Sequence, residues 1–165
     1  MSTTAIYATD PDQPEILELL AQSDAYMAAL YPPESNHLLD LRALQRPEVI
    51  FLAARIDERI RGCGALVPTG NRDWAEIKRM FVAPAARGQR LGRQLLEALE
   101  ARARREGLPL LRLETGIRQP EAIALYRSAG FREIEPFGDY RLDPLSLFME
   151  KRLSVQSLSS TQVGA

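Results

Sequence analysis

The sequence contains very little cysteine, histidine or lysine. Cys63 and His37 are the only residues of their kinds, and Lys78 and Lys151 are the only lysines. A disulfide within the chain needs two cysteines, and a zinc site needs several Cys or His ligands, so both are excluded within one chain and we expect no metal. Cys63 lies in a strand-like apolar segment, which favours a small buried side chain over a nucleophile.

Long apolar runs and an excess of one charge are also missing. No apolar run approaches the roughly 18 residues of a membrane span, and the N-terminus lacks the charged and then apolar pattern of a signal peptide. The net charge is −1 and the sequence pI is about 5.9, so there is no general basic field for a polyanion. We therefore expect a cytoplasmic protein that binds neither membranes nor nucleic acid.

The length and the order of patterns favour one α/β domain. With 165 residues, we expect a single domain over residues 1–153 and a disordered tail over residues 154–165, which are rich in Ser, Thr and Gln. A break in the first helix near Ser23 and Asp24 stays open. Strand patterns occupy residues 5–9, 49–56, 60–67, 76–82, 110–115, 131–135 and 147–151, and helical patterns occupy residues 16–30, 38–44, 89–106 and 120–129.

One turn carries the strongest chemical signal. Residues 87–92 read Arg-Gly-Gln-Arg-Leu-Gly and join a strand to a helix. The start of a helix exposes about four unpaired backbone amides and a partial positive charge, and the two glycines let a bulky anion approach the main chain. The two arginines of the turn, with Arg93, add side-chain charge. The turn predicts a pyrophosphate site, although an ordinary crossover with solvated arginines would explain the turn alone equally well.

The elements around this turn follow a specific order. A strand (76–82), a turn of the form [Arg or Gln]-x-x-Gly-x-[Gly or Ala], a leucine-rich helix, a second strand (110–115) and a helix ending Leu-Tyr-x-x-x-Gly-Phe (121–131) come in succession. This order, over about half of the chain, resembles the GNAT superfamily of N-acetyltransferases, in particular its bacterial, uncharacterised small-molecule type. The chain departs from the family pattern at Arg90, where glycine is usual, and at Gln119, where asparagine is common.

The resemblance implies a fold and an activity. The expected GNAT fold is an α/β (α+β) fold with a mixed, mostly antiparallel twisted sheet of about six or seven strands, about four helices and a parallel strand pair at the coenzyme site. The implied enzyme moves an acetyl group from acetyl-CoA to a primary amine of a small molecule. One alternative stays open, namely a non-catalytic domain that binds acyl-CoA and serves as a sensor or partner. Dimers are frequent in this superfamily, which leaves a homodimer open.

Two residues are candidates for proton transfer. Tyr126 falls on the position that commonly protonates the thiolate in GNAT enzymes, and a phenol with an ordinary pKa of about 10 suits that task. A tyrosine that only packs against the sheet is the alternative. Glu76 occupies a strand position where some GNAT enzymes carry a general base, although a solvated carboxylate is equally common there. Strand alternation predicts one face for Glu76, Lys78, Met80 and Val82.

The resemblance also implies binding residues. The coenzyme is expected to contact residues of the strand, the turn and the last helix, namely Met80, Phe81, Val82, Arg87, Gly88, Gln89, Arg90, Leu91, Gly92, Arg93, Gln119, Ala122 and Ile123. The acceptor is expected to contact Tyr31, Glu34, Asn36, His37, Lys78, Arg79 and Arg118. Arg79 and Arg118 are candidates for holding an acceptor carboxylate.

Overall fold

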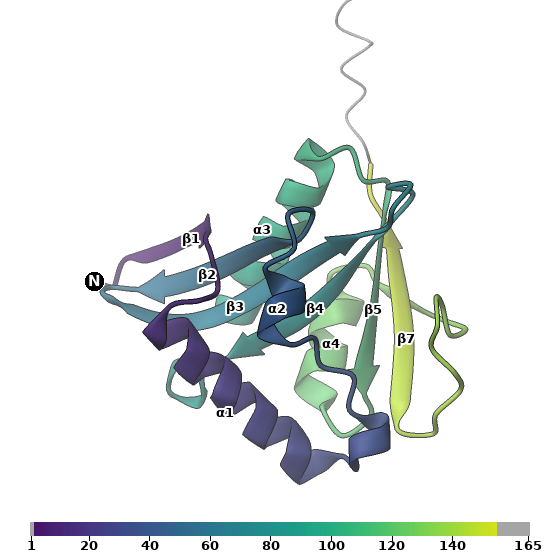
Figure 1. The fold of residues 1–165 in the computed structure, drawn as a ribbon, viewed down its shortest axis with the longest axis horizontal. Helices are drawn as coiled ribbons and strands as arrows, with labels where there is room; N and C mark the ends of the chain where they lie inside the picture. Colours follow the sequence, from purple (N-terminus) through teal and green to yellow (C-terminus); the bar gives the residue numbers. More distant parts are fainter. Residues whose placement is uncertain (1, 155–165) are drawn as a thin grey trace, which may run out of the picture.

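The structure, a computed structural model, describes residues 2–154 and centres on one seven-stranded sheet (Figure 1). The strand order is β1-β2-β3-β4-β5-β7-β6. The β4–β5 pair is parallel and every other neighbouring pair is antiparallel, which confirms the predicted mixed sheet. Residues 155–165, most of the predicted tail, lie outside the described residues.

The elements alternate largely as the sequence patterns predict. The strands are β1 (Thr4–Ala8), β2 (Ile50–Ile56), β3 (Arg59–Pro68), β4 (Ala75–Val82), β5 (Leu110–Gly116), β6 (Arg132–Ile134) and β7 (Ser146–Arg152). The α-helices are α1 (Pro14–Leu30), α2 (Leu41–Leu44), α3 (Leu91–Arg105) and α4 (Pro120–Ser128), and two 3₁₀ turns are η1 (Pro33–Ser35) and η2 (Pro84–Ala86). No helix among residues 2–154 is long and apolar enough to span a membrane.

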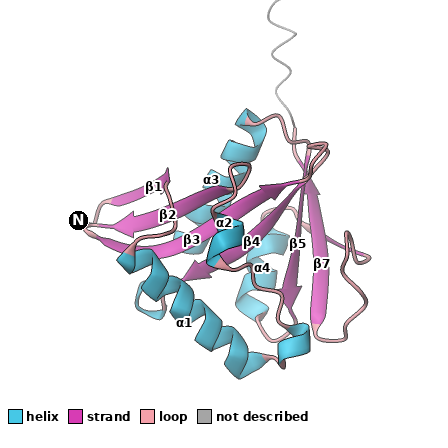
Figure 2. Ribbon diagram, viewed as in Figure 1, coloured by secondary structure: helices cyan, strands magenta, loops and turns pink. Residues whose placement is uncertain are grey.

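The helices form two layers, one on each face of the sheet (Figure 2). On one face, α3 buries a stripe of leucines that includes Leu96 and Leu99, and α4 adds Tyr126 to the same cluster. On the other face, α1 packs Ile16 and Leu19 against β2 and β3. Burial of each such aliphatic side chain contributes about 1.5–3 kcal/mol, so the sheet is fixed from both sides.

A β-bulge in β4 changes the direction of its side chains. Along β3 and β4, Cys63 pairs with Phe81 but Ala65 pairs with Lys78, so two β4 residues, Arg79 and Met80, face one β3 residue. Arg79 takes a left-handed backbone (φ 57°). The prediction that Met80 shares a face with Lys78 is therefore wrong, because the extra residue shifts the alternation.

The packing on each side of the bulge shows the new arrangement. Lys78 reaches His37 on the face of α1, whereas Met80 and Val82 pack with the leucines of α3. β4 thus presents polar groups to one face before the bulge and apolar groups to the other face after it.

The first helix is continuous where the sequence left a break open. Ser23 is buried within α1, and Asp24 pairs with Arg79 of β4. No glycine or proline interrupts the helix at this point. The contact between Asp24 and Arg79 further holds the helical turn that contains Ser23 and Asp24. The second predicted helix shortens to α2, whose start is capped by Asp40.

Candidate active site

The parallel strands β4 and β5 form a wedge. They pair only at Ala75 with Leu111 and at Glu76 with Arg112, and beyond this point they diverge (Figure 1). β4 keeps its antiparallel partner β3 as far as Val82. The edge of β4 that faces β5 is therefore open after Glu76, and an extended ligand can pair with such an edge as an added strand.

The turn after β4 presents a row of unpaired backbone amides. Gly88 (φ 85°) and Arg90 (φ 61°) are both left-handed, and Arg90 is the N-cap of α3. Among the described residues, the backbone amides from Gly88 to Arg93 have no hydrogen-bond acceptor. Exposed amides at a helix N-terminus form an anion site, so the turn can hold phosphate groups.

The arginines of the turn have different surroundings. Arg87 lies over the rings of Tyr26 and Phe81, and its Nε donates to the Val82 carbonyl. Arg93 donates to the Ser128 hydroxyl of α4 (2.6 Å). These two guanidinium groups brace the turn against its neighbours, and both keep charge beside the amide row.

The hydroxyl of Tyr126 lies close to the β4 bulge. It is 3.7 Å from the Met80 sulfur, and the ring packs edge-on against Phe131. Burial and, secondly, the charge of Glu114 raise the pKa of Tyr126 above its ordinary value. The phenol therefore stays protonated at neutral pH and can act as a proton donor.

A polar network lies on the opposite face of β4. The Tyr140 hydroxyl donates to Glu76 Oε2 (2.5 Å), and Lys78 Nζ donates to the Tyr140 hydroxyl (2.7 Å) and to the His37 carbonyl (2.6 Å). Lys78 Nζ also lies 3.5 Å from Glu76 Oε2. Burial, followed by the charge of Glu76, raises the pKa of Tyr140. The network holds one oxygen of the Glu76 carboxylate.

A second carboxylate, Glu114, lies on β5 on this same face. Its Oε2 accepts a hydrogen bond from the Ser146 hydroxyl (2.8 Å). Glu114 is two residues beyond Arg112, the last β5 residue paired with β4, so it lies beside the wedge. Burial raises the pKa of Glu114, which brings this carboxylate closer to the range of a general base at neutral pH.

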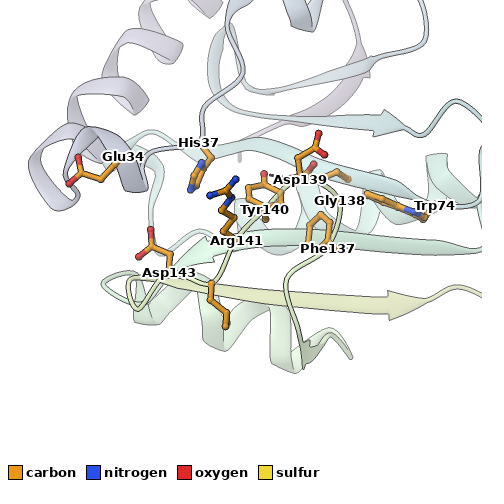
Figure 3. Close-up of a pocket in the computed structure, with 11 residues that line it drawn as sticks. Glu34, His37, Trp74, Phe137, Gly138, Asp139, Tyr140, Arg141 and Asp143 are labelled. Atoms are coloured by element: carbon orange, nitrogen blue, oxygen red, sulfur yellow. Dashed lines mark hydrogen bonds between the residues drawn. The ribbon is translucent and has the colours of Figure 1, made fainter.

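A pocket of about 710 Å³ opens beside Glu76 (Figure 3). Its wall combines residues of η1 and its flank, the β4 entry and the long loop between β6 and β7. The lining residues are Glu34, His37, Trp74, Glu76, Phe137, Gly138, Asp139, Tyr140, Arg141, Leu142 and Asp143. A pocket of this size fits a small organic molecule.

Comparison with known proteins decides what this arrangement is. The sequence pattern of the acetyltransferase (GNAT) family matches residues 14–131. The chain belongs to the GNAT acetyltransferase family. It is accordingly an acyl-CoA-dependent acetyltransferase, and the predicted resemblance is confirmed.

Individual GNAT relatives match nearly the whole chain. An IAA acetyltransferase of Azospirillum brasilense is 49% identical over 153 residues, which cover 93% of this chain and 100% of the relative. A Klebsiella pneumoniae structure assigned to the acyl-CoA N-acyltransferases has a TM-score of 0.77 and 39% identity, covering 92% and 99% of the two chains. The PaiA N-acetyltransferase of Thermoplasma acidophilum, in complex with coenzyme A, has a TM-score of 0.70 at 19% identity, covering 91% and 99%. This last likeness concerns the fold alone.

The residues expected around the GNAT coenzyme come from β4, the turn after it and α4. Met80, Phe81 and Val82 form the end of β4, and residues 87–93 form the amide row and its arginines. Gln119 is the N-cap of α4, which also carries Ala122 and Ile123. Gly92 allows close packing, because a Cβ there would come within 3.3 Å of Leu125.

The residues expected around the acceptor separate into two groups. Glu34 and His37 line the pocket, and Lys78 joins the network beside it. Asn36 is absent from the lining, and its Oδ1 is buried without a hydrogen-bond partner among the described residues. Arg79 is absent from the lining as well, and its side chain pairs with Asp24 of α1.

Tyr31 and Arg118 contact each other, and neither lines the pocket. The Arg118 amide donates to the Tyr31 hydroxyl, which in turn donates to Gln119 Oε1 (3.2 Å). Tyr31 is buried against Gly116, where a Cβ would collide with its hydroxyl. The Arg118 side chain donates to the Leu30 carbonyl. These contacts fasten the end of α1 to the loop before α4.

Two residues of the site were missed from the sequence. Tyr140 is an isolated aromatic in a loop, and no local pattern signals that its hydroxyl reaches Glu76. Glu114 did leave a signal, because it interrupts an apolar strand at the same alternation as Arg112. A charged residue on a strand that is covered on both faces marks a candidate for function.

Proposed function

We propose that this GNAT enzyme transfers the acetyl group of acetyl-CoA directly to the primary amine of a small molecule. The observation that carries the proposal is the row of unpaired amides from Gly88 to Arg93 at the mouth of the β4–β5 wedge. The amides would hold the pyrophosphate, and the open edge of β4 would pair with the pantetheine arm. The thioester would then lie near Tyr126.

The likeness to proteins with named activities supports this reading. The 49% identical relative is an acetyltransferase, and a solved structure of the same fold is a complex with coenzyme A. The activity named for the 49% identical relative favours an enzyme over a sensor that only binds acyl-CoA. We also propose that one domain spans residues 1–153.

The transfer needs two proton movements. The acceptor amine is an ammonium ion near neutral pH if its pKa is about 10, so a base must first remove a proton. The amine nitrogen then forms a bond to the acetyl carbon as the carbon–sulfur bond breaks, and the departing thiolate takes the proton of the Tyr126 hydroxyl. The second proton lost by the nitrogen as the amide forms restores the Tyr126 hydroxyl. The site has groups for both movements.

Glu76 and Glu114 are the two candidate bases. Glu76 was expected from the sequence and faces the pocket, but its Oε2 is already held by Tyr140. Glu114 lies beside the wedge and accepts one hydrogen bond, from Ser146. Replacing each by Gln and measuring kcat/KM against pH identifies the base, because only the loss of the true base abolishes the acidic limb of the profile.

Coenzyme binding is tested first by thermal melting with acetyl-CoA, with ATP and NAD as controls. A ligand at about 100 times its dissociation constant stabilises by about 2.7 kcal/mol, or roughly 5–10 °C for a chain of this size. Arg90→Glu at the start of α3 should weaken the shift, whereas Arg105→Glu at the exposed end of the same helix should leave it unchanged. A cooperative melt whose temperature does not change with acetyl-CoA would contradict the proposed coenzyme site.

A further inference from the structure

We propose that the acceptor is an arylalkylamine, meaning an aromatic ring joined by a short aliphatic chain to a primary ammonium group, without a carboxylate. This inference rests on the proposed acetyl transfer and names its substrate class. It follows from the distribution of rings and charges along the pocket beside Glu76.

One end of the pocket is aromatic. Trp74 packs edge-on against Phe137 with ring centroids 5.3 Å apart, and Phe137 packs in the same way against Tyr140 at 5.1 Å. Arg112 lies over the Trp74 ring and pairs with Glu150, a carboxylate that it shares with Arg132. Rigid rings of this kind form a wall for a flat apolar group.

The other end of the pocket carries the carboxylates of Glu34 and Asp143 (Figure 3). Two further carboxylates line the pocket between the ends, Asp139 from the loop before β7 and Glu76 from β4. Arg141 is the single guanidinium among the lining residues (Figure 3). This balance favours a cation over a zwitterion or an anion.

Asp143 is held as an ionised group. Its two oxygens accept hydrogen bonds from the Ser35 hydroxyl (2.6 Å) and from the Leu145 amide (2.8 Å). The Ser35 bond, followed by the Leu145 bond, lowers the pKa of Asp143 below its ordinary value. The negative charge therefore persists at any pH at which the enzyme would bind an ammonium group.

The direction of the pocket matches the direction of the wedge. Trp74 and Glu76 follow one another on the same face as β4 runs towards its divergence from β5, with Lys78 next. In Figure 3, Trp74 and Phe137 lie at one end, whereas Glu34, His37 and Asp143 lie at the other. A ring beside Trp74 would point its amine along β4 towards the thioester.

The rings and the acids make different demands on a substrate. An α-carboxylate beside the amine would approach Glu76 and Glu114, which repel it. An aliphatic diamine would satisfy the acids but leave the aromatic wall without a partner. An arylalkylamine satisfies both ends of the pocket.

The test compares matched substrates by acetyl-CoA-dependent thiol release. We expect kcat/KM for 2-phenylethylamine and tryptamine to exceed that for phenylalanine and tryptophan by at least about tenfold, because the carboxylate adds repulsion in a partly shielded site. The aliphatic control is 1,4-diaminobutane, which we expect to react more slowly than either arylalkylamine. Equal or higher kcat/KM for the amino acids, or for the diamine, would overturn the proposal.

Two variants test the two ends separately. Trp74→Leu should lower kcat/KM for 2-phenylethylamine several-fold and leave kcat/KM for 1,4-diaminobutane unchanged. Asp143→Asn should lower kcat/KM for both amines and reduce the discrimination against phenylalanine. Glu97→Gln, which removes an exposed carboxylate on α3, is the control and should leave kcat/KM for both amines unchanged. Equal effects of Trp74→Leu on both amines would contradict the aromatic wall.

The outcomes separate this inference from the proposed function. If acetyl-CoA raises the melting temperature but neither arylalkylamine is acetylated, the acceptor class is wrong and the coenzyme site stands. If acetyl-CoA gives no shift and no amine releases thiol, the proposed acetyl transfer itself fails.

Discussion

The contact between Arg79 and Asp24 offers a sharp test of how the β4 bulge is held. The Arg79 side chain is 4% exposed, whereas that of Asp24 is 59% exposed, and their closest atoms are 2.7 Å apart. Arg79 Nη2 also donates to the Leu20 carbonyl, and its Nε is buried without a partner among the described residues. The guanidinium charge thus depends on Asp24 for its compensation.

Replacing Asp24 by Ala should destabilise the protein strongly. Removing one partner of a fully buried ion pair costs about 3–5 kcal/mol, because it leaves an uncompensated charge in the interior. Asp24 is more than half exposed, so solvent already screens the pair, and we expect a loss of about 1–3 kcal/mol. For a chain of this size, a loss of about 2 kcal/mol lowers the Tm by roughly 4–8 °C.

The assay is urea unfolding of three variants together with thermal melting. Arg79→Met removes the charge with its partner still present, so its loss should be smaller than that of Asp24→Ala. The double variant should match Arg79→Met alone, because no buried charge then remains. If Asp24→Ala melts within about 1 °C of the wild type, or if Arg79→Met is the more damaging single change, the reasoning about the buried charge is refuted.

Four further outcomes follow from single residues. Tyr126→Phe should lower kcat at least about tenfold and leave the KM for acetyl-CoA unchanged. A lower kcat together with a comparably raised KM would indicate a packing role instead. Arg90→Gly should raise the unfolding free energy by about 0.5–1 kcal/mol, since it relieves a left-handed backbone, and an unchanged urea midpoint would contradict this. Burial raises the pKa of the Cys63 thiol to about 12, so a thiol reagent should react only after unfolding, which absorbance detects; rapid labelling of the native protein would contradict burial. Because burial raises the folded-state pKa of Glu114, the unfolding free energy should fall as pH rises through that pKa, and Glu114→Gln should flatten this dependence in urea unfolding.

Local pattern was a good guide to the elements and a poor one to the side-chain directions. The strand before residue 84 and the helix after the Gly-containing turn were predicted nearly at their true bounds, because alternation, proline and leucine spacing are local properties. The face of Met80 was predicted wrongly. A bulge leaves no mark in the alternation of a strand that is half buried on both faces, so its place depends on how β3 pairs with β4.

The candidate site divides in the same way. The turn at residues 87–92 and the position of Tyr126 could be proposed from the sequence because each is defined by residues close together in the chain. Tyr140 was not, because its hydroxyl meets Glu76 only when the loop before β7 folds across the sheet, 64 residues away in sequence. Tyr31 stays a predicted acceptor contact. Its burial against Gly116 and the hydrogen bond of its hydroxyl to Gln119, 88 residues away in sequence, are contacts that no local pattern signals.

By itself, the sequence determined the family, the order of strands and helices, and the turn whose backbone amides can hold an anion. These properties depend on local backbone preference and on periodic burial, which a linear pattern records. Tertiary structure alone decided the bulge at Arg79, the wedge between β4 and β5, and the aromatic and acidic ends of the pocket. Each of these features forms only when strands or loops from distant parts of the chain come into contact. The energy of those contacts depends on pairs of residues that no single segment contains.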